Sequence, residues 1–444
     1  MSSGKLKFTV NPGSQLLGAI RVPGDKSISH RSIMLGALAE GVTKVSGFLE
    51  GEDSLATLQA FREMGVSIDG PVAGEVSIYG VGMGGLSQPV GDLYLGNSGT
   101  SMRLLSGLLS GAAKFELVLS GDESLSSRPM RRVTDPLQSM GAEIASEDDG
   151  TAPLKISKSD HLSGVEYEMP MASAQVKSSL LLAGIYAQGE TCVTEPAPTR
   201  DHTERMLQGF GYEVRRENFG DGESKVCLTG GGSLNAVAVD VPADISSAAF
   251  FLVGASIAQG SDLLLEHVGI NPTRIGVINI LREMGADIEL LNETISGGEP
   301  VADLRVKYAP LHGIEIPLEQ VPLAIDEFPV LFVAAAVADG QTLLSGAEEL
   351  RVKESDRIQV MADGLAILGV EVEVTPDGII IEGGDSFSGG TVESHGDHRI
   401  SMSFAIAALR ATAEIEILDC DNVNTSFPGF SQLASSVGLK IRES

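Results

Sequence analysis

The sequence predicts an α/β protein of two domains, each built from three copies of one unit around buried helices. Three observations lead to this fold class. The chain has 444 residues, which exceeds what one hydrophobic core usually supports. Apolar helical segments recur along the whole chain, and amphipathic helical segments alternate with them. Short alternating stretches between the helices are typical of β-strands.

The first family of segments is apolar on every side, so each helix is expected to lie among apolar neighbours. The segments begin at Arg31, Ser101, Lys177, Ser246, Pro329 and Ile400. Five of them end in glycine, where we expect a positive φ to end the helix. These glycines, 70, 78, 71 and 80 residues apart, are Gly41, Gly111, Gly189, Gly260 and Gly340.

The second family is amphipathic, and each member leads into an alternating strand. Each has a glycine after its last helical turn, at steps of 76, 70, 74, 84 and 69 residues: Gly65, Gly141, Gly211, Gly285, Gly369 and Gly438. Both families keep the same phase. The chain therefore divides into six units, each with a buried helix, an outer helix and several short strands. The alternative interpretation is a doubly wound α/β protein with coincidental spacing.

Polar residues concentrate directly before the six apolar helices. The segments are PGDKSISHR from Pro23, LGNSGTSMR from Leu95, ASAQVKSS from Ala172, PADISS from Pro242, AIDEFP from Ala324 and SHGDHR from Ser394. Helix amino ends carry partial positive charge and unpaired N–H donors, so they favour anions. If both domains face these ends toward a common cleft, that cleft binds anionic ligands. The alternative is six independent helix caps with incidental cations.

Charge and cysteine content narrow the function classes. With 31 Lys+Arg against 60 Asp+Glu, the formal net charge is −29, which excludes a nucleic-acid binder that relies on a global positive field. The only cysteines are Cys192, Cys227 and Cys420, and their spacing supports neither a disulfide framework nor a zinc site. No apolar stretch has the length of a signal peptide or a membrane span. We expect a cytoplasmic protein that binds neither membrane nor nucleic acid.

Two carboxylates lie in surroundings that suit acid and base chemistry. Asp326 directly precedes an apolar helix, and Glu354 lies between Lys353 and Arg357. Neighbouring cations favour an ionised carboxylate, whereas burial favours a protonated one. Taken alone, Asp326 is equally explained as a helix cap and Glu354 as a local ion pair. No GxSxG, HExxH or GxxxxGK[ST] motif competes with this pair.

Eight segments in this order resemble the 5-enolpyruvylshikimate-3-phosphate (EPSP) synthase family across nearly the whole chain. They are PGDKSISHRS, LGNSGTSMRLL, SSRPMRR, SAQVKSSLL, TRDHTERML, RVKESDRI, GDHRISMSFA and TSFPGF. The resemblance implies two inverse α/β domains, each of three repeated βαβαββ-like units around buried helices. Residues 1–22 plus 242–444 would form one domain and 23–241 the other, with the active site in the cleft between them.

The family transfers the enolpyruvyl group of phosphoenolpyruvate to the 5-hydroxyl of 3-phosphoshikimate and releases phosphate. The resemblance implies no metal, no cofactor, small anionic substrates and a monomer. It assigns catalysis to Asp326 as base, Glu354 as acid, and Lys26. The residues implied for 3-phosphoshikimate are Lys26, Ser27, Arg31, Ser173, Ala174, Gln175, Arg200, Asp326 and Lys353. Those implied for phosphoenolpyruvate are Lys26, Asn97, Gly99, Arg128, Gln175, Arg357 and Arg399.

One departure from the family pattern concerns the C-terminal element. Many relatives have Lys just before it, whereas this chain has Asn424 and Thr425 ahead of Phe427 and Pro428. Gly99 is retained where some herbicide-tolerant relatives carry a bulkier residue, so we expect glyphosate to fit. Two alternative functions require different residues. A UDP-N-acetylglucosamine enolpyruvyl transferase would use a cysteine in a Gly-rich loop, and a non-catalytic anion-binding protein would not need both carboxylates.

Overall fold

The computed structural model describes residues 5–159, 161–220 and 222–444, which form two compact units. Unit 1 comprises Met1–Pro23, Pro242–Thr294 and Pro300–Ser444. Unit 2 comprises Gly24–Val241 and Ile295–Glu299. Each unit has its own cluster of buried apolar side chains. Residues 1–4 of the first expected domain lie outside the described residues.

The segment Ile295–Glu299 differs from the division expected from sequence, which placed it with residues 242–444. It includes the turn between β18 (Asp287–Ser296) and β19 (Glu299–Lys307) and the adjoining ends of both strands, but it packs with unit 2. There Ser296 Oγ lies 3.1 Å from Asp240 Oδ2, and the buried carboxylate of Glu299 lies 2.8 Å from His202 Nδ1. These are contacts between residues far apart in sequence, so no local pattern signals them.

Apolar helices form the centre of each unit, as the sequence predicts. Those of unit 2 are α1 (Lys26–Leu38), α3 (Gly99–Ala112) and α6 (Ala174–Gly184). Those of unit 1 are α8 (Ile245–Ile257), α10 (Phe328–Ala335) and α12 (His398–Ala407). Every residue of α8 and α10 is buried, which only an apolar sequence without a polar face permits.

Amphipathic helices follow at the predicted places. They are α2 (Glu52–Glu63), α5 (Arg131–Ser139), α7 (His202–Gly209), α9 (Gly276–Glu283), α11 (Arg357–Ile367) and α14 (Phe430–Ser436). All six predicted glycines have positive φ, from 87° to 122°. After α9, for example, Gly285 N donates to Arg282 O and Ala286 N to Leu281 O, the hydrogen-bond pair of a Schellman motif. This prediction is confirmed.

The glycine prediction for the first family is wrong in detail. Gly111 lies inside α3, without positive φ, and a Cβ there would lie only 2.4 Å from the Tyr186 side chain. Close packing therefore requires this glycine. The other four have φ of 87° to 107°, but they lie three to five residues beyond the helix ends at Leu38, Gly184, Ile257 and Ala335. They form turns into the next segment rather than helix caps.

Each unit also contains three principal sheets. In unit 2 the first sheet has the strand order β16 (Ala238–Asp240), β4 (Val42–Ser46), β6 (Glu75–Tyr79), β5 (Ser67–Val72). The second has the order β7 (Leu93–Tyr94), β8 (Leu117–Ser120), β10 (Leu154–Ser157), β9 (Glu143–Ala145). The third has the order β11 (Glu166–Glu168), β12 (Glu190–Glu195), β14 (Glu223–Thr229), β13 (Arg215–Gly220). In unit 1 the first sheet has the strand order β18 (Asp287–Ser296), β19 (Glu299–Lys307), β17 (Asp262–Gly269), β2 (Leu17–Ile20). The second has the order β20 (Gln341–Leu344), β22 (Gly378–Glu382), β21 (Val372–Thr375). The third has the order β23 (Gly390–Glu393), β24 (Ile415–Leu418), β1 (Phe8–Val10), β25 (Ile441–Glu443).

One rule relates these sheets. In the five four-stranded sheets, one edge strand runs parallel to its neighbour: β16 beside β4, β7 beside β8, β11 beside β12, β2 beside β17, and β23 beside β24. In the three-stranded sheet, an isolated parallel bridge from Glu315 to Leu343 of β20 takes that place. The six units of sequence are therefore six copies of one α/β arrangement.

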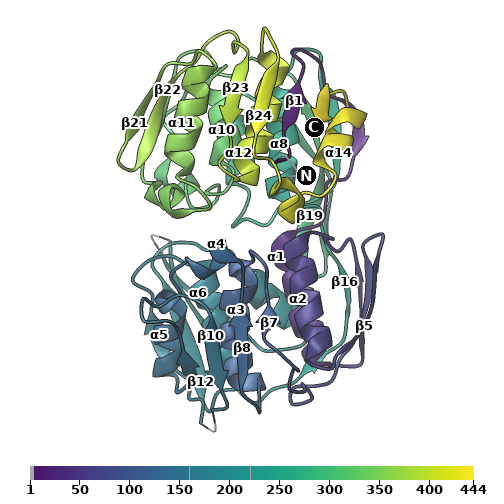
Figure 1. Cartoon of the computed structure of the whole chain (residues 1–444), viewed down its shortest axis with the longest axis vertical. Coiled ribbons are helices and arrows are strands. Elements are labelled where there is room, and N and C mark those ends of the chain that lie inside the picture. Colours follow the sequence, from purple (N-terminus) through teal and green to yellow (C-terminus); the bar gives the residue numbers. More distant parts are fainter. Residues whose placement is uncertain (1–4, 160, 221) are drawn as a thin grey trace. The chain divides into compact units, whose positions relative to one another are not determined.

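The first strand completes the last sheet of unit 1. Phe8 of β1 pairs with Ile417 of β24 on one side and with Glu443 of β25 on the other, both antiparallel. Figure 1 shows this purple strand beside the yellow C-terminal strands. Unit 1 is therefore closed by both ends of the chain. The short elements not yet named are β3 (Ala39–Glu40), β15 (Leu234–Asn235), α4 (Glu123–Ser126), α13 (Val423–Ser426), η1 (Leu318–Gln320), η2 (Glu348–Val352) and η3 (Ala408–Arg410).

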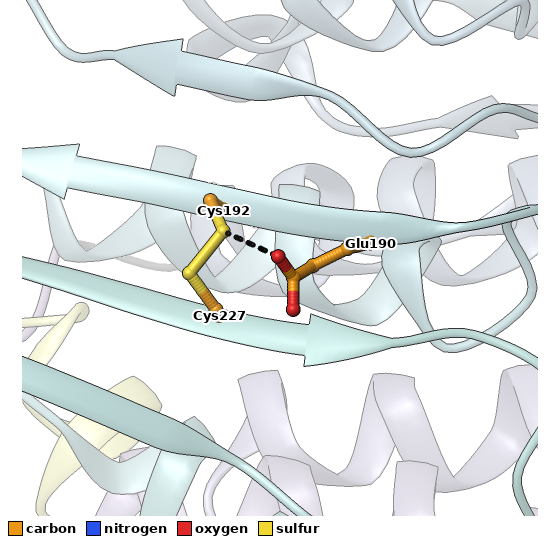
Figure 2. Close-up of side chains that lie close together, drawn as sticks. All are labelled: Glu190, Cys192 and Cys227. Carbon is orange, nitrogen blue, oxygen red and sulfur yellow. Dashed lines mark hydrogen bonds between the residues drawn. A yellow bond between two sulfur atoms is a disulfide. The ribbon is translucent and has the colours of Figure 1, made fainter.

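Cys192 and Cys227 form a disulfide, which corrects the expectation drawn from their spacing (Figure 2). They are 35 residues apart, but the antiparallel register of β12 and β14 places them directly opposite each other. The pairing depends on the register of the sheet, so it is invisible in a linear search. Glu190 lies beside them, with its carboxylate 3.6 Å from Cys192 Sγ. Because the sulfurs are bonded to each other, this group offers no thiolate pair to a metal.

None of the helices within the described residues is both long and apolar enough to span a bilayer.

Candidate active site

In unit 2 the amino ends of α1, α3 and α6 come together. Each is capped from its polar segment: the side chains of Asp25, Ser98 and Ser173 accept hydrogen bonds from N–H groups of the first turns. Gln175 Nε2 of α6 donates to Thr100 Oγ1 of α3 at 3.2 Å. Near the start of α1, His30 Nδ1 lies 3.4 Å from Ser101 Oγ of α3. Three helix amino ends with their partial positive charges therefore lie in one region of this unit.

Asn97, Gly99 and Arg128 lie together at the start of α3. Arg128 Nη2 donates to Asn97 Oδ1 at 2.6 Å, and Asn97 Nδ2 donates to Asp122 at 2.8 Å. A Cβ added at Gly99 would lie 3.1 Å from Arg128 Nη1. A larger residue at this position would therefore crowd the guanidinium of Arg128.

Arg103 is a cation of this region that the sequence analysis missed. It lies one helical turn after Gly99, and its Nη1 donates to Gln175 Oε1 at 2.5 Å. The same Nη1 would be 3.5 Å from a Cβ at Gly99, so Arg103 and Arg128 flank that glycine. The available signal was an arginine inside an otherwise apolar helix, which needs a buried partner.

Lys26 and Arg31 are on α1 and differ in their surroundings. Lys26 Nζ forms an ion pair with Asp53 of α2 at 2.5 Å, a partner that the sequence analysis did not name. Arg31 is only 4% exposed and donates to Thr203, Ser178 and the carbonyl of Ser27. Burial lowers its pKa to about 10, so it stays protonated at neutral pH. Three of its five N–H donors are used within the protein.

The remaining predicted residues of unit 2 lie at α6 and near α7. Ser173 caps α6, and Ala174 and Gln175 are its first two residues. Arg200 lies between β12 and α7, directly after buried Thr199. Arg31 ties these segments together, because it bonds Ser178 of α6 and Thr203 of α7. Unit 2 thus gathers the ten predicted residues that fall between Lys26 and Arg200 around a few helix ends.

In unit 1, Asp326 does not cap α10. The cap position is occupied by Glu327, whose side chain makes no capping hydrogen bond, and Pro329 lies in the first turn. Asp326 Oδ1 instead lies 3.3 Å from Arg357 Nη1 and 3.5 Å from Lys353 Nζ. The capping alternative is therefore wrong, and Asp326 is a carboxylate held between two cations.

Arg357 is the centre of the charged cluster in unit 1. Its side chain is 1% exposed, and its guanidinium contacts Asp397 at 2.9 Å, Glu354 at 2.5 Å and Asp326 at 3.3 Å. Burial alone would lower the pKa of Arg357, but the three carboxylates outweigh burial and raise it. Asp397, which also caps α12, was not named in the sequence analysis. One guanidinium thus contacts three acidic side chains.

This cluster decides the charge of Glu354. Burial alone would raise the pKa of Glu354. Attraction to Arg357 and His398 acts in the opposite direction and outweighs burial, so the pKa of Glu354 lies below its ordinary value. The pKa of Asp397 is lowered by the same cations against the same effect of burial. Glu354 retains 35% of its side-chain exposure, whereas Asp397 is fully buried. Both groups are therefore ionised, and only Glu354 is open to a ligand.

Arg399 and Lys353 complete the cluster in unit 1. Arg399 Nη1 donates to the carbonyl of Asp326 at 2.9 Å and lies 3.7 Å from Glu327 Oε1. Lys353 Nζ also contacts Glu349 at 2.9 Å. The five predicted residues of unit 1, Asp326, Lys353, Glu354, Arg357 and Arg399, are therefore brought together by three helix starts and one loop.

The C-terminal departure from the family pattern lies in α13. Asn424 is exposed there, and Thr425 Oγ1 donates to Asn422 O at 2.7 Å. Neither side chain supplies the positive charge that a lysine would bring to this position.

Comparison with known proteins identifies the family. A family profile described as EPSP synthase (3-phosphoshikimate 1-carboxyvinyltransferase) matches residues 10–433. This chain belongs to that family. A 3-phosphoshikimate 1-carboxyvinyltransferase of Methylococcus capsulatus is 65% identical, with 98% of each chain covered. Another, from Alkalilimnicola ehrlichii, is 66% identical, with 98% of this chain and 96% of the relative covered.

Solved structures agree with this assignment. EPSP synthase from Acinetobacter baumannii is 60% identical and has a TM-score of 0.90. The match covers 99% of this chain and 100% of that structure's chain. The enolpyruvyl transferase NikO from Streptomyces tendae has a TM-score of 0.78 at 17% identity, over 99% of both chains, which shows a shared fold. The predicted fold class, the family and the expectation of a transferase are confirmed.

Proposed function

We propose that this chain transfers the enolpyruvyl group of phosphoenolpyruvate to the 5-hydroxyl of 3-phosphoshikimate, with release of phosphate. The observation that carries the proposal is the cluster around Arg357, where two ligand-accessible carboxylates lie among cations that suit an anionic substrate. Family membership supports it, because EPSP synthase relatives match nearly the full chain. The expected small, anionic substrates follow from the same family.

Unit 2 supplies the groups proposed to hold the substrates. Ser173, Ala174, Gln175 and Arg200, with Lys26, Ser27 and Arg31, bind 3-phosphoshikimate. Arg31 contributes through the two donors that the protein leaves available. Asn97, Gly99 and Arg128 bind phosphoenolpyruvate, with Lys26 and Gln175 in contact with both substrates. Guanidinium groups suit this task because they bind carboxylate and phosphate through paired hydrogen bonds.

Unit 1 supplies the groups proposed for the chemistry. Asp326 accepts the proton of the 5-hydroxyl, which then attacks C2 of phosphoenolpyruvate, while Glu354 protonates the methylene carbon. The product of this addition is a tetrahedral intermediate. Loss of phosphate and of a proton from the new methyl group restores the enol ether, so a base must act where an acid acted before. Lys353, Arg357 and Arg399 balance the negative charge of the substrates.

The charge state of Glu354 sets a condition on this mechanism. Arg357 lowers the pKa of Glu354 in the ligand-free protein, whereas the proposed acid must carry a proton. An anionic substrate on Arg357 shares the charge of the guanidinium and weakens its hold on Glu354. We expect the pKa of Glu354 to rise as phosphoenolpyruvate binds, which makes the acid available when its substrate is present.

Phosphate release with different acceptors tests the proposed function. The protein is mixed with phosphoenolpyruvate and either 3-phosphoshikimate or UDP-N-acetylglucosamine. We expect phosphate only with 3-phosphoshikimate, because the predicted donors of unit 2 match an acceptor that carries both phosphate and carboxylate. Phosphate release with the aminosugar nucleotide alone would assign the chain to the other enolpyruvyl transfer.

Further expectations rest on the resemblance. We propose that the protein acts as a monomer in the cytoplasm, without metal or cofactor. Within the described residues, the one group of side chains close enough to share a metal is Glu190 with the bonded cysteines, far in sequence from Asp326 and Glu354. Glyphosate inhibition that competes with phosphoenolpyruvate is expected because glycine is retained at position 99, where a Cβ would lie 3.1 Å from Arg128 Nη1.

A further inference from the structure

Lys177 is an ammonium group buried completely inside unit 2. It lies in α6, and its Nζ is 2.9 Å from Glu195 Oε2 and 2.7 Å from Glu204 Oε1. The side chains of Lys177 and Glu195 have no exposed surface, and that of Glu204 has 7%. Burying three charges is costly unless they are paired, so the position of each constrains the other two.

The two glutamates flank the segment that carries Arg200. Glu195 is the last residue of β12, and Glu204 lies in the first turn of α7. The connection between these elements contains Thr199 and Arg200. One ammonium group from α6 therefore holds both sides of this connection. Its own helix begins with Ser173 at the cap and reaches Lys177 about one turn later.

Glu195 also holds the connection directly. Thr199 Oγ1 donates to Glu195 Oε2 at 2.5 Å, next to the ammonium group of Lys177. The other oxygen, Oε1, accepts hydrogen bonds from Arg216 at 2.9 Å and from Ser224 at 2.7 Å. With four donors around it, this carboxylate has little freedom to move. Thr199 is thus tied to a fixed point, and Arg200 is the next residue.

We propose that Lys177, Glu195 and Thr199 are positioning residues that fix Arg200 relative to Ser173–Gln175. The inference rests on the proposed function, in which these two segments bind 3-phosphoshikimate. The three positioning residues do not touch the substrate; they set the distance between the groups that do. Phosphoenolpyruvate shares Lys26 and Gln175 with this site, but its other assigned contacts lie on other segments. Loss of this contact is therefore expected to weaken binding of 3-phosphoshikimate more than binding of phosphoenolpyruvate.

Thr199→Val tests this role with little change in shape. Valine keeps the volume of threonine but lacks the hydroxyl that donates to Glu195. We expect the Kd for 3-phosphoshikimate to rise about tenfold, while the KM for phosphoenolpyruvate stays within about twofold. Thr199→Ser, which retains the hydroxyl, should return the Kd close to the wild-type value. Thr199→Ala provides a second loss of the hydroxyl should valine prevent folding.

Ser224→Ala is the matched control. It removes a hydrogen bond of similar length from the same carboxylate, but Ser224 lies on β14, away from Arg200 in the sequence. The unfolding temperatures of Thr199→Val and Ser224→Ala show whether the two substitutions destabilise the protein to a similar extent. We expect Ser224→Ala to leave the Kd for 3-phosphoshikimate within about twofold of wild type.

The outcomes separate this inference from the proposed function. A wild-type protein that neither binds nor converts 3-phosphoshikimate contradicts the proposed function, and the inference falls with it. A functional wild type with an unchanged Kd in Thr199→Val and Thr199→Ala overturns the inference alone. Equal losses in Thr199→Val and Ser224→Ala also overturn it, because they would indicate a general effect of weakening Glu195.

Discussion

At the scale of single residues, the contacts of Arg357 decide what Glu354 can do. A guanidinium buried among Asp326, Glu354 and Asp397 keeps all three close and lowers the pKa of the one that must donate a proton. Asp397 is fully buried and caps α12, so it anchors Arg357 while Glu354 remains 35% exposed. The arrangement separates a structural carboxylate from one that a substrate can reach.

The pH dependence of phosphoenolpyruvate binding follows from this arrangement. If the lowered pKa of Glu354 rises in the complex, the complex binds more protons than the free protein, and affinity increases as pH falls. We expect affinity for phosphoenolpyruvate, measured without 3-phosphoshikimate so that no turnover occurs, to increase more in wild type than in Glu354→Gln as pH falls from about 8 to 6. Titration of the ligand itself cancels because both proteins meet the same ligand.

Calorimetry in two buffers of different ionisation enthalpy measures the protons taken up. Wild type should take up more than Glu354→Gln. Identical proton uptake by the two proteins would show that Glu354 does not change its charge on binding.

Residue-level prediction from the sequence succeeded where the partners are close in the chain. Glu354 and Arg357 are three positions apart, so their ion pair was already a stated alternative. Asp397 and Arg103 were missed because their partners, Arg357 and Gln175, are 40 and 72 positions away. A charged residue within an apolar helix was the available sign for Arg103, but it does not name the partner.

At the scale of elements, the repeated helices explain why the polar residues come together. Apolar helices must be buried side by side. In unit 2 the starts of α3 and α6 meet through Thr100 and Gln175, and in unit 1 the starts of α10 and α12 meet through Asp326 and Arg399. The amphipathic helices cover the unit from outside and end at glycines with positive φ. The sequence predicted those six glycines because a local backbone requirement determines them.

Gly369, after α11, provides a test of that requirement. Its φ is +87°, and a Cβ there would meet no heavy atom closer than 3.3 Å, so strain of the backbone outweighs crowding. We expect Gly369→Ala to lower the free energy of unfolding by about 1 to 2 kcal/mol, as measured by urea denaturation. Gly384→Ala is the control within the same unit, because Gly384 lacks positive φ and has open space around it. Equal losses in the two variants would rule out the backbone explanation.

Tertiary pairing explains the element-level predictions that failed. Gly111 was predicted to end a helix with positive φ, but it lies in the last turn of α3 without positive φ and packs closely against Tyr186. The spacing of Cys192 and Cys227 supported no disulfide, but the register of β12 and β14 makes them neighbours. The segment Ile295–Glu299 was assigned to the wrong domain because its partners lie in unit 2. None of these contacts leaves a periodic signal in the sequence.

At the scale of the whole molecule, the charge distribution matters more than the net charge of −29. Within each unit, cations gather near helix starts: Lys26, Arg31 and Arg128 in unit 2, and Arg357 and Arg399 in unit 1. Carboxylates pair with several of these cations, and an anionic substrate can compete with those carboxylates for them. An acidic protein can therefore present local sites for anions.

The most direct test of the account is single-turnover phosphate release by Asp326→Asn and Glu354→Gln, measured alongside 3-phosphoshikimate binding. Each substitution removes a proposed proton-transfer group but keeps its size, so release should slow by about a hundredfold or more. The Kd for 3-phosphoshikimate should change by less than about tenfold in each variant. Phosphate release at the wild-type rate in either variant would contradict the assignment of acid and base to this pair.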